Sequence, residues 1–122
     1  MRARGYGKII NLSSTFSRRV SPGLAAYAAQ KAAVSHLTEA LAVEWAADGI
    51  RVNALAPTAV RTPSREDSLQ GEELRALVSH IPLERIATID DLLGAAIFLA
   101  SAASDFVTGQ TLFVDGGYSV AD

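Results

Sequence analysis

The chain has 122 residues, a formal net charge of −2 and no cysteine. This length allows one domain with a real hydrophobic core but not two, and 49% of the residues are hydrophobic. The lack of cysteine excludes disulfides, thiolate nucleophiles and cysteine-ligated metals. The slightly acidic balance gives no electrostatic reason to expect nucleic acid or an anionic membrane as a partner.

The beginning of the chain and its apolar runs indicate the compartment. Residues 1–8 (MRARGYGK) are polar and lead into only a short apolar run, unlike a secretory signal peptide. No apolar run in the sequence approaches the roughly 18–20 residues that a membrane span needs. We therefore expect a cytoplasmic protein without a membrane partner.

The first predicted elements are a strand and a long helix. Lys8–Ser13 is a short apolar run with β-branched residues and predicts a buried strand. Thr15–Gly23 is rich in Ser, Arg, Pro and Gly and predicts a loop. The alanine-rich segment Ala25–Ala47 predicts a helix that ends just before Gly49, a usual terminator. One apolar stripe of this helix comprises Leu37, Leu41 and Trp45, with Val34 beside them.

A second strand, a loop and a second helix follow. Ile50–Ala56 predicts a strand, which Pro57 stops. Thr58–Ser64 has no periodicity and is expected to be a loop. Glu66–Ser79 is expected to be a moderately amphipathic helix.

The last predicted elements are a third helix and a third strand. Thr88 lies three residues before Asp91, which is the spacing of an N-cap and an acidic first turn, and this helix is expected to reach about Ala103. Thr111–Val114 predicts the final strand, closed by a turn. Strands separated by helices pair in parallel through right-handed crossovers. We therefore expect an α/β domain with three parallel strands.

Tyr27 and Lys31 form the motif that carries chemistry. Residues four apart on a helix share a face. Such a pair can transfer protons, because an ammonium about 4 Å from a phenolate stabilises it by ~4 kcal/mol at an effective dielectric constant near 20. The alternative is a surface pair on an ordinary helix, and the pair by itself does not decide between the two.

Ser14 supplies a context for this pair. It lies thirteen residues before Tyr27, at the C-terminal end of the first predicted strand. In open α/β sheets, ligands bind outside the carboxyl ends of the strands. The loop after the strand can place Ser14 beside the first turn of the helix. There its hydroxyl would donate to a substrate carbonyl oxygen while Tyr27 delivers or removes the proton.

Five stretches extend this pattern along the chain: GKIINLSS, YAAQKAAV, LAVEWAADGIRVNALAPTAVRT, ASDFVTGQ and TLFVDGG. In this order and spacing the chain resembles the C-terminal half of the short-chain dehydrogenases/reductases, from about Gly7 to Tyr118. The resemblance implies that residues 1–122 form a single partial Rossmann-like domain, the catalytic half of a doubly wound parallel sheet. The N-terminal dinucleotide-binding half is absent from this sequence, as are its glycine-rich turn and the family's Asn-Asn-Ala-Gly segment.

The resemblance also implies catalytic roles for three residues. The family's catalytic serine falls on Ser14 rather than Ser13, because of the interval to Tyr27. Tyr27 matches the family's general acid/base. Lys31 matches the lysine that supports this tyrosine and holds the nicotinamide ribose hydroxyls.

The segment PTAVRT matches the family's segment that packs on the nicotinamide. Pro57 begins it, Val60 would offer backbone groups to the carboxamide, and Thr62 its hydroxyl. The family usually has glycine after the proline, where this chain has Thr58. The implied cofactor is NAD or NADP, without a preference, and no metal is expected.

Two functions are compatible with these features. The first is hydride transfer between a nicotinamide cofactor and an alcohol/carbonyl substrate, in a homo-oligomer (dimer or tetramer) as the family commonly forms. The second is a truncated, non-catalytic oligomerisation or interaction module derived from such an enzyme. A serine hydrolase is disfavoured, because Ser14 lacks the glycine-flanked elbow of that class. In either case the first strand is expected to be an exposed edge.

Overall fold

The computed structural model describes residues 1–63 and 70–121. Its strands β1 (Gly7–Leu12), β2 (Ile50–Pro57) and β3 (Thr111–Val114) form one parallel sheet in the order β1-β2-β3. Gly7 pairs with Ile50 at the start of β1, and Ala54 pairs with Thr111 at the start of β3. The predicted α/β architecture with three parallel strands is confirmed.

The central strand β2 carries the core. Its residues are apolar without alternation because both faces of the sheet are covered, and Val52, Ala54 and Ala56 are fully buried. Asn53 is also buried, but its amide is satisfied: Nδ2 donates to the Val107 carbonyl at 2.9 Å, and Oδ1 accepts from Gln110 N at 3.0 Å. This side chain therefore fixes the segment that leads into β3.

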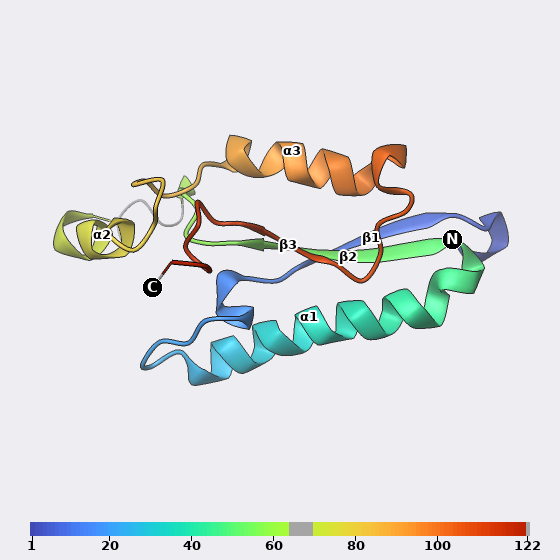
Figure 1. The fold of residues 1–122 in the computed structure, drawn as a ribbon, viewed down its shortest axis with the longest axis horizontal. Coiled ribbons are helices and arrows are strands. Elements are labelled where there is room, and N and C mark those ends of the chain that lie inside the picture. Colours follow the sequence, from blue (N-terminus) through green and yellow to red (C-terminus); the bar gives the residue numbers. More distant parts are fainter. Residues whose placement is uncertain (64–69, 122) are drawn as a thin grey trace.

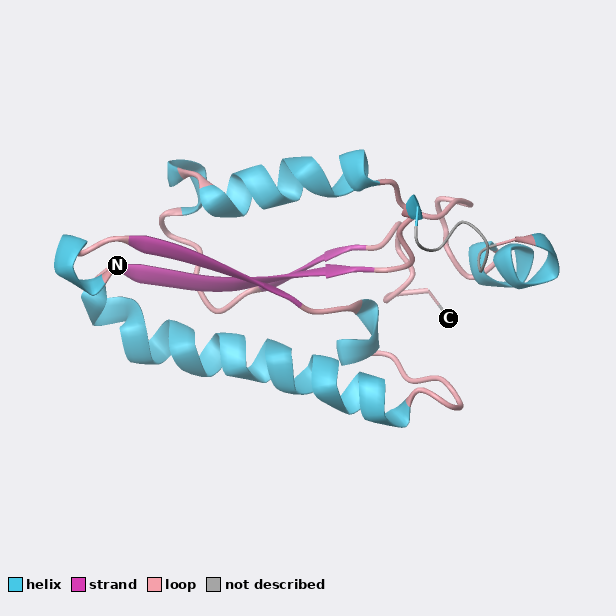
Figure 2. Ribbon diagram, turned by 180° about the vertical axis from the view of Figure 1, so that it is seen from behind, coloured by secondary structure: helices cyan, strands magenta, loops and turns pink. Residues whose placement is uncertain are grey.

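One long helix covers each face of the sheet, as Figures 1 and 2 show. Helix α1 (Ala25–Trp45) lies on one face, and α3 (Ile89–Ala100) lies on the other. Alanine gives α1 high intrinsic helix propensity. After the short 3-10 helix η3 (Ala46–Asp48), Gly49 adopts the left-handed conformation with φ 71°, so the predicted terminator is confirmed.

The fully buried residues on the face of α1 that packs on the sheet are small. Ala28, Thr38 and Ala42 are its buried members, and small side chains let a helix lie close to a sheet. The predicted apolar stripe is therefore only partly buried: Leu41 and Trp45 pack against the core, whereas Leu37 is 52% exposed. Leu37 therefore lies at the exposed end of this stripe.

Two helix boundaries differ from the prediction. Helix α2 (Gly71–Val78) begins after Gln70, whose backbone is extended with φ −134°, so the predicted helix is not continuous through that residue. Residues 66–69 of that prediction lie outside the described residues. Helix α3 ends at Ala100, because Ser101 is extended, and the 3-10 helix η5 (Ala102–Ser104) follows. In Figure 1, α2 lies beyond the end of the sheet toward which the strands point.

Strand β1 is the exposed edge that the sequence predicted. In the part of the chain that the structure describes, it pairs with β2 alone. Ile10 and Leu12, which alternate along the strand and so share one face, are 37% and 61% exposed. None of the described helices has the length and apolar character that a membrane crossing requires.

Candidate active site

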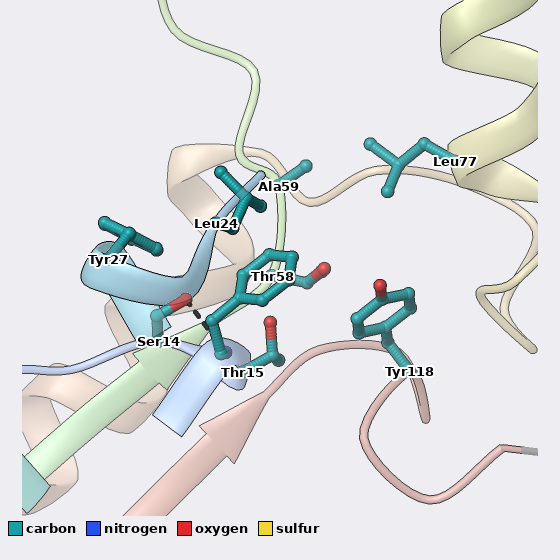
Figure 3. Close-up of a pocket in the computed structure, with 9 residues that line it drawn as sticks. Ser14, Thr15, Leu24, Tyr27, Thr58, Ala59, Leu77 and Tyr118 are labelled. Atoms are coloured by element: carbon teal, nitrogen blue, oxygen red, sulfur yellow. Dashed lines mark hydrogen bonds between the residues drawn. The ribbon is translucent and has the colours of Figure 1, made fainter. Parts of the chain in front are cut away.

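A cavity of about 420 Å³ lies at the carboxyl ends of the strands (Figure 3). Several segments far apart in the sequence meet there: the 3-10 helix η2 (Thr15–Ser17) that follows β1, the start of α1, the loop after β2, helix α2 and the segment after β3. This is the position at which open α/β sheets bind their ligands. The lining residues are Ser14, Thr15, Phe16, Leu24, Tyr27, Thr58, Ala59, Leu77 and Tyr118.

Ser14 is held at the start of η2 with its hydroxyl on the cavity. It is 6% exposed, and its Oγ accepts a hydrogen bond from Phe16 N at 3.2 Å. Its carbonyl accepts from Ser17 N at 3.0 Å and from Ser17 Oγ at 2.7 Å. Because Oγ acts only as an acceptor in its capping bond, the hydroxyl proton remains available to a ligand.

Ser13 has a different environment from its neighbour. Its Oγ lies 2.8 Å from Ser35 Oγ and donates to the Lys31 carbonyl at 3.2 Å, both on α1. Successive side chains leave an extended backbone on opposite sides, so Ser13 faces the helix while Ser14 lines the cavity. The structure brings Ser14, not Ser13, into the cavity with Tyr27.

Tyr27 lies in the first turn of α1 and is 41% exposed. Its ring packs edge-to-face on Phe16, with ring centroids 6.0 Å apart and an interplanar angle of 70°. The Nζ of Lys31 lies 5.7 Å from the centroid of the Tyr27 ring and donates to the Leu12 carbonyl at 2.9 Å. Lys31 is thus held between the end of β1 and Tyr27, as the four-residue spacing predicts.

The segment after β2 passes beside the cavity. Pro57 is the last residue of β2, and Val60 forms an isolated parallel bridge with Ala87. The bridge uses the Ala59 carbonyl, 3.0 Å from Ala87 N, and the Arg61 amide, 2.8 Å from the Ala87 carbonyl. The backbone N–H and C=O of Val60 itself are therefore directed to the opposite side.

Thr58 and Ala59 line the cavity. Pro57, Val60 and Thr62 are not among the described residues that line it. Among the described residues other than glycine, only Glu84 has a positive φ. Thr58 therefore needs no left-handed backbone at the position where the family usually has glycine. Its side chain adds a hydroxyl to the cavity instead.

Tyr118 also lines the cavity, although no sequence pattern predicted it there. Figure 3 shows Tyr118 on the segment after β3, on the same side of the cavity as Leu77 of α2. Arg19 Nη1 donates to the carbonyls of Tyr118 and Ala121, at 2.6 and 3.0 Å, and its guanidinium carbon lies 4.9 Å from the Tyr118 ring centroid. The available signal was an aromatic residue just after the carboxyl end of the last strand.

The chain is similar in sequence to part of several known dehydrogenases. Residues 1–119 match the model of the enoyl-(acyl carrier protein) reductase family. The gluconate 5-dehydrogenase of Gluconobacter oxydans is 43% identical over 119 residues, which are 97% of this chain and 46% of that protein. The 2-dehydro-3-deoxy-D-gluconate 5-dehydrogenase of Bacillus subtilis is 47% identical over 122 residues, covering 97% of this chain and 47% of that protein.

The three-dimensional structure gives the same result. The crystal structure of a gluconate 5-dehydrogenase from Burkholderia cenocepacia, in complex with NADP and tartrate, has a TM-score of 0.93 and 48% sequence identity to this chain. The match covers 99% of this chain and 48% of that one, so the chain spans about half the length of the relatives it matches. On its motifs, its parallel sheet and these similarities, the chain belongs to the short-chain dehydrogenase/reductase family.

Proposed function

We propose that this chain supplies the catalytic part of an NAD(P)-dependent oxidoreductase that interconverts an alcohol and a carbonyl compound. As part of this proposal, residues 1–122 form one partial Rossmann-like domain. The observation that carries the proposal is that Ser14 and Tyr27 line the same cavity at the carboxyl ends of the strands. Relatives named as dehydrogenases, and one of them crystallised with NADP, support the reaction class and the cofactor class.

The roles follow from the chemistry of the side chains. The Ser14 hydroxyl donates a hydrogen bond to the substrate carbonyl oxygen, which polarises the carbonyl group. The Tyr27 hydroxyl delivers its proton to that oxygen in reduction and takes it back in oxidation. The Lys31 ammonium stabilises the deprotonated Tyr27 by its charge. When bound, the nicotinamide supplies or accepts the hydride at the carbonyl carbon, so that hydride and proton together convert the carbonyl to the alcohol.

The residues present fit the nicotinamide end of the cofactor. The backbone N–H and C=O of Val60 point away from its bridge partner, which leaves a donor and an acceptor for a carboxamide. Lys31 Nζ has three N–H donors, and one of them is used in the hydrogen bond to the Leu12 carbonyl. The others can donate to the ribose hydroxyls of the cofactor. Pro57 and Thr62 lie on the same segment as Val60 and are proposed to complete this contact.

The test is a titration of the purified chain with NADH and NADPH, followed through Trp45 or cofactor fluorescence. Binding of the wild-type chain in the micromolar range, weakened at least tenfold in Lys31→Ala, would support the proposal. Ser13→Ala is the control, because it removes a polar group near Lys31 but outside the cavity. Unchanged affinity in Lys31→Ala, or no binding at millimolar cofactor, would contradict the proposal.

A second candidate is a non-catalytic module that assembles into homo-oligomers. It is favoured by apolar side chains exposed on and after α3: Leu93 is 48% exposed, Ile97 64%, and Phe106 is completely exposed. Such exposure is expected of surfaces that become buried between subunits. Stable dimers or tetramers in light scattering, combined with no binding of either cofactor, would favour this function over the enzyme.

A further inference from the structure

Thr15 carries a buried hydroxyl that has no partner in the described part of the chain. The residue is 1% exposed, and its Oγ1 is buried without a hydrogen bond. The comparable buried threonine, Thr38, is satisfied: its Oγ1 donates to the Val34 carbonyl at 2.8 Å and accepts from Asn11 Nδ2 at 2.9 Å. An unpaired buried hydroxyl costs folding free energy, so its retention calls for an explanation.

This unpaired group belongs to the wall of the cavity. Thr15 lies next to Ser14, and its backbone is fixed because the amides of Arg18 and Arg19 both donate to the Thr15 carbonyl at 3.0 Å. Figure 3 shows the hydroxyls of Thr15, Thr58 and Tyr118 among the sticks that surround the same space. The cavity therefore combines several hydroxyls with an apolar wall, and the buried, unpaired Thr15 hydroxyl belongs to a residue of that wall.

We propose that Thr15 is a specificity-determining residue, whose hydroxyl forms a hydrogen bond with a hydroxyl group that the substrate carries near its reacting carbon. The proposal rests on the proposed function, in which the adjacent Ser14 holds the carbonyl oxygen. The implied substrate class is a polyhydroxylated alcohol or carbonyl compound. A purely apolar compound of the same size would leave Thr15 unpaired, and a site that leaves buried polar groups unpaired rejects such a compound.

The first experiment measures thermal unfolding of the 122-residue chain. Thr15→Val keeps the shape and removes the unsatisfied oxygen, so the variant is expected to unfold at the same temperature or a higher one. Thr38→Val is the matched control and is expected to unfold at a lower temperature, because its hydroxyl is paired. If Thr15→Val lowers the unfolding temperature as much as Thr38→Val does, the Thr15 hydroxyl has a structural partner and the proposal is overturned.

The second experiment measures ligand binding by NMR with the isotope-labelled chain. D-fructose and 2-hexanone are the probes, since both have six carbons and only the first carries hydroxyls. Saturable shifts of the amides of residues 14–17 are expected with D-fructose, with affinity about five- to tenfold lower in Thr15→Val and kept in Thr15→Ser. Equal affinities of the wild type and Thr15→Val for D-fructose, or no saturable shift, would overturn the proposal.

The two proposals fail in different ways. Loss of the proposed function shows as absent NADH and NADPH binding, which does not involve the Thr15 hydroxyl. Loss of the present proposal shows as unchanged D-fructose binding in Thr15→Val, with cofactor binding intact.

Discussion

The Ser13 and Ser35 hydroxyl oxygens lie 2.8 Å apart and tie the end of β1 to the middle of α1. The next residue, Ser14, lines the cavity instead. Two adjacent serines thus have separate surroundings, one between strand and helix and one in the wall of the cavity. Substitution of each by alanine is therefore expected to separate stability from catalysis.

Ser13→Ala is expected to lower the free energy of unfolding by about 1 kcal/mol, because it removes hydrogen bonds to α1, and to leave the rate of NAD(P)H-dependent carbonyl reduction unchanged. Ser14→Ala is expected to lower that rate by roughly a hundredfold or more, because a donor to the carbonyl oxygen is lost. Urea denaturation and initial rates measure the two effects. Equal loss of rate in both variants would show that the assignment to Ser14 is incorrect.

Gly49 is the position at which a side chain is least tolerable. It has φ +71°, and a Cβ there would collide with the backbone carbonyl of Gly5. Gly49→Ala is expected to lower the free energy of unfolding by about 2–5 kcal/mol, from left-handed strain and overpacking together. Gly23 has φ +79° but open space around it, so Gly23→Ala is expected to cost only about 1–2 kcal/mol. Equal costs in the two variants would refute the role of the Gly5 contact.

Asp91 makes the stability depend on acid pH. Both nitrogens of the Arg85 fork donate to its two oxygens at 2.7 Å, and Thr88 N donates to Oδ2 at 2.7 Å. The hydrogen bonds from Arg85 first, then those from Thr88, hold the Asp91 pKa well below its usual range. A pKa lowered by folding means that the ionised carboxylate stabilises the folded chain above about pH 4, the unfolded value.

This contribution is lost as the pH falls below about 4 toward the folded-state pKa. Asp91→Asn is therefore expected to be less stable than the wild type at neutral pH and to lose less stability on acidification, as measured by urea denaturation across the acid range. Asp90→Asn is the control in the same helical turn. Parallel pH profiles of Asp91→Asn and the wild type would contradict this reasoning.

Arg19 is expected to order the segment after β3. Its Nη1 donates to the carbonyls of both Tyr118 and Ala121, and lysine lacks the planar guanidinium that also lies 4.9 Å from the Tyr118 ring centroid. In Arg19→Lys, amide hydrogen exchange of residues 118–121 is expected to become about tenfold faster, which corresponds to ~1.4 kcal/mol of local opening. Arg18→Lys should leave exchange there unchanged, since the Arg18 guanidinium lies over the Phe113 ring instead. Similar exchange in both variants would argue against this role of Arg19.

Local sequence signals predicted the strands and the ends of α1 well. β-branched runs bounded by Gly, Pro or Ser mark strands, and Gly49 supplies the left-handed turn that ends the helical region. The inner face of α1 was harder to predict. Leu37 lies on an apolar stripe but is 52% exposed, whereas Thr38 and Ala42 are buried, because close packing of the helix on the sheet favours small side chains over large ones.

The candidate site was predictable where its residues lie at fixed intervals. Ser14, Tyr27 and Lys31 were predicted to lie together because one strand end and one helical turn position them; Ser14 and Tyr27 line one cavity, and Lys31 Nζ lies 5.7 Å from the Tyr27 ring centroid. Tyr118 and the unpaired hydroxyl of Thr15 were not found. The position of Tyr118 depends on a tertiary contact with Arg19, and the environment of the Thr15 hydroxyl depends on how the cavity wall packs. Neither can be predicted from a local sequence pattern.

The parallel register has a consequence for the order of folding. Gly7 pairs with Ile50 across α1, and Ala54 pairs with Thr111 across a still longer stretch of chain. Closing these long loops costs entropy before any contact compensates for it, so folding is expected to be slow for a chain of this size. The β1–α1–β2 unit closes the shorter loop and is expected to form the nucleus, with β3 docking afterwards.

Kinetic measurements can test this order. Val52→Ala in β2 should slow refolding, whereas Phe113→Ala in β3 should mainly speed unfolding; the opposite pattern would show that β3 belongs to the nucleus. Tyr118 follows β3 and lines the cavity, so this part of the cavity wall is expected to form only when β3 docks, in the last step of folding. The ligand cavity is then the latest part of the molecule to form and the first to be lost when the chain begins to unfold.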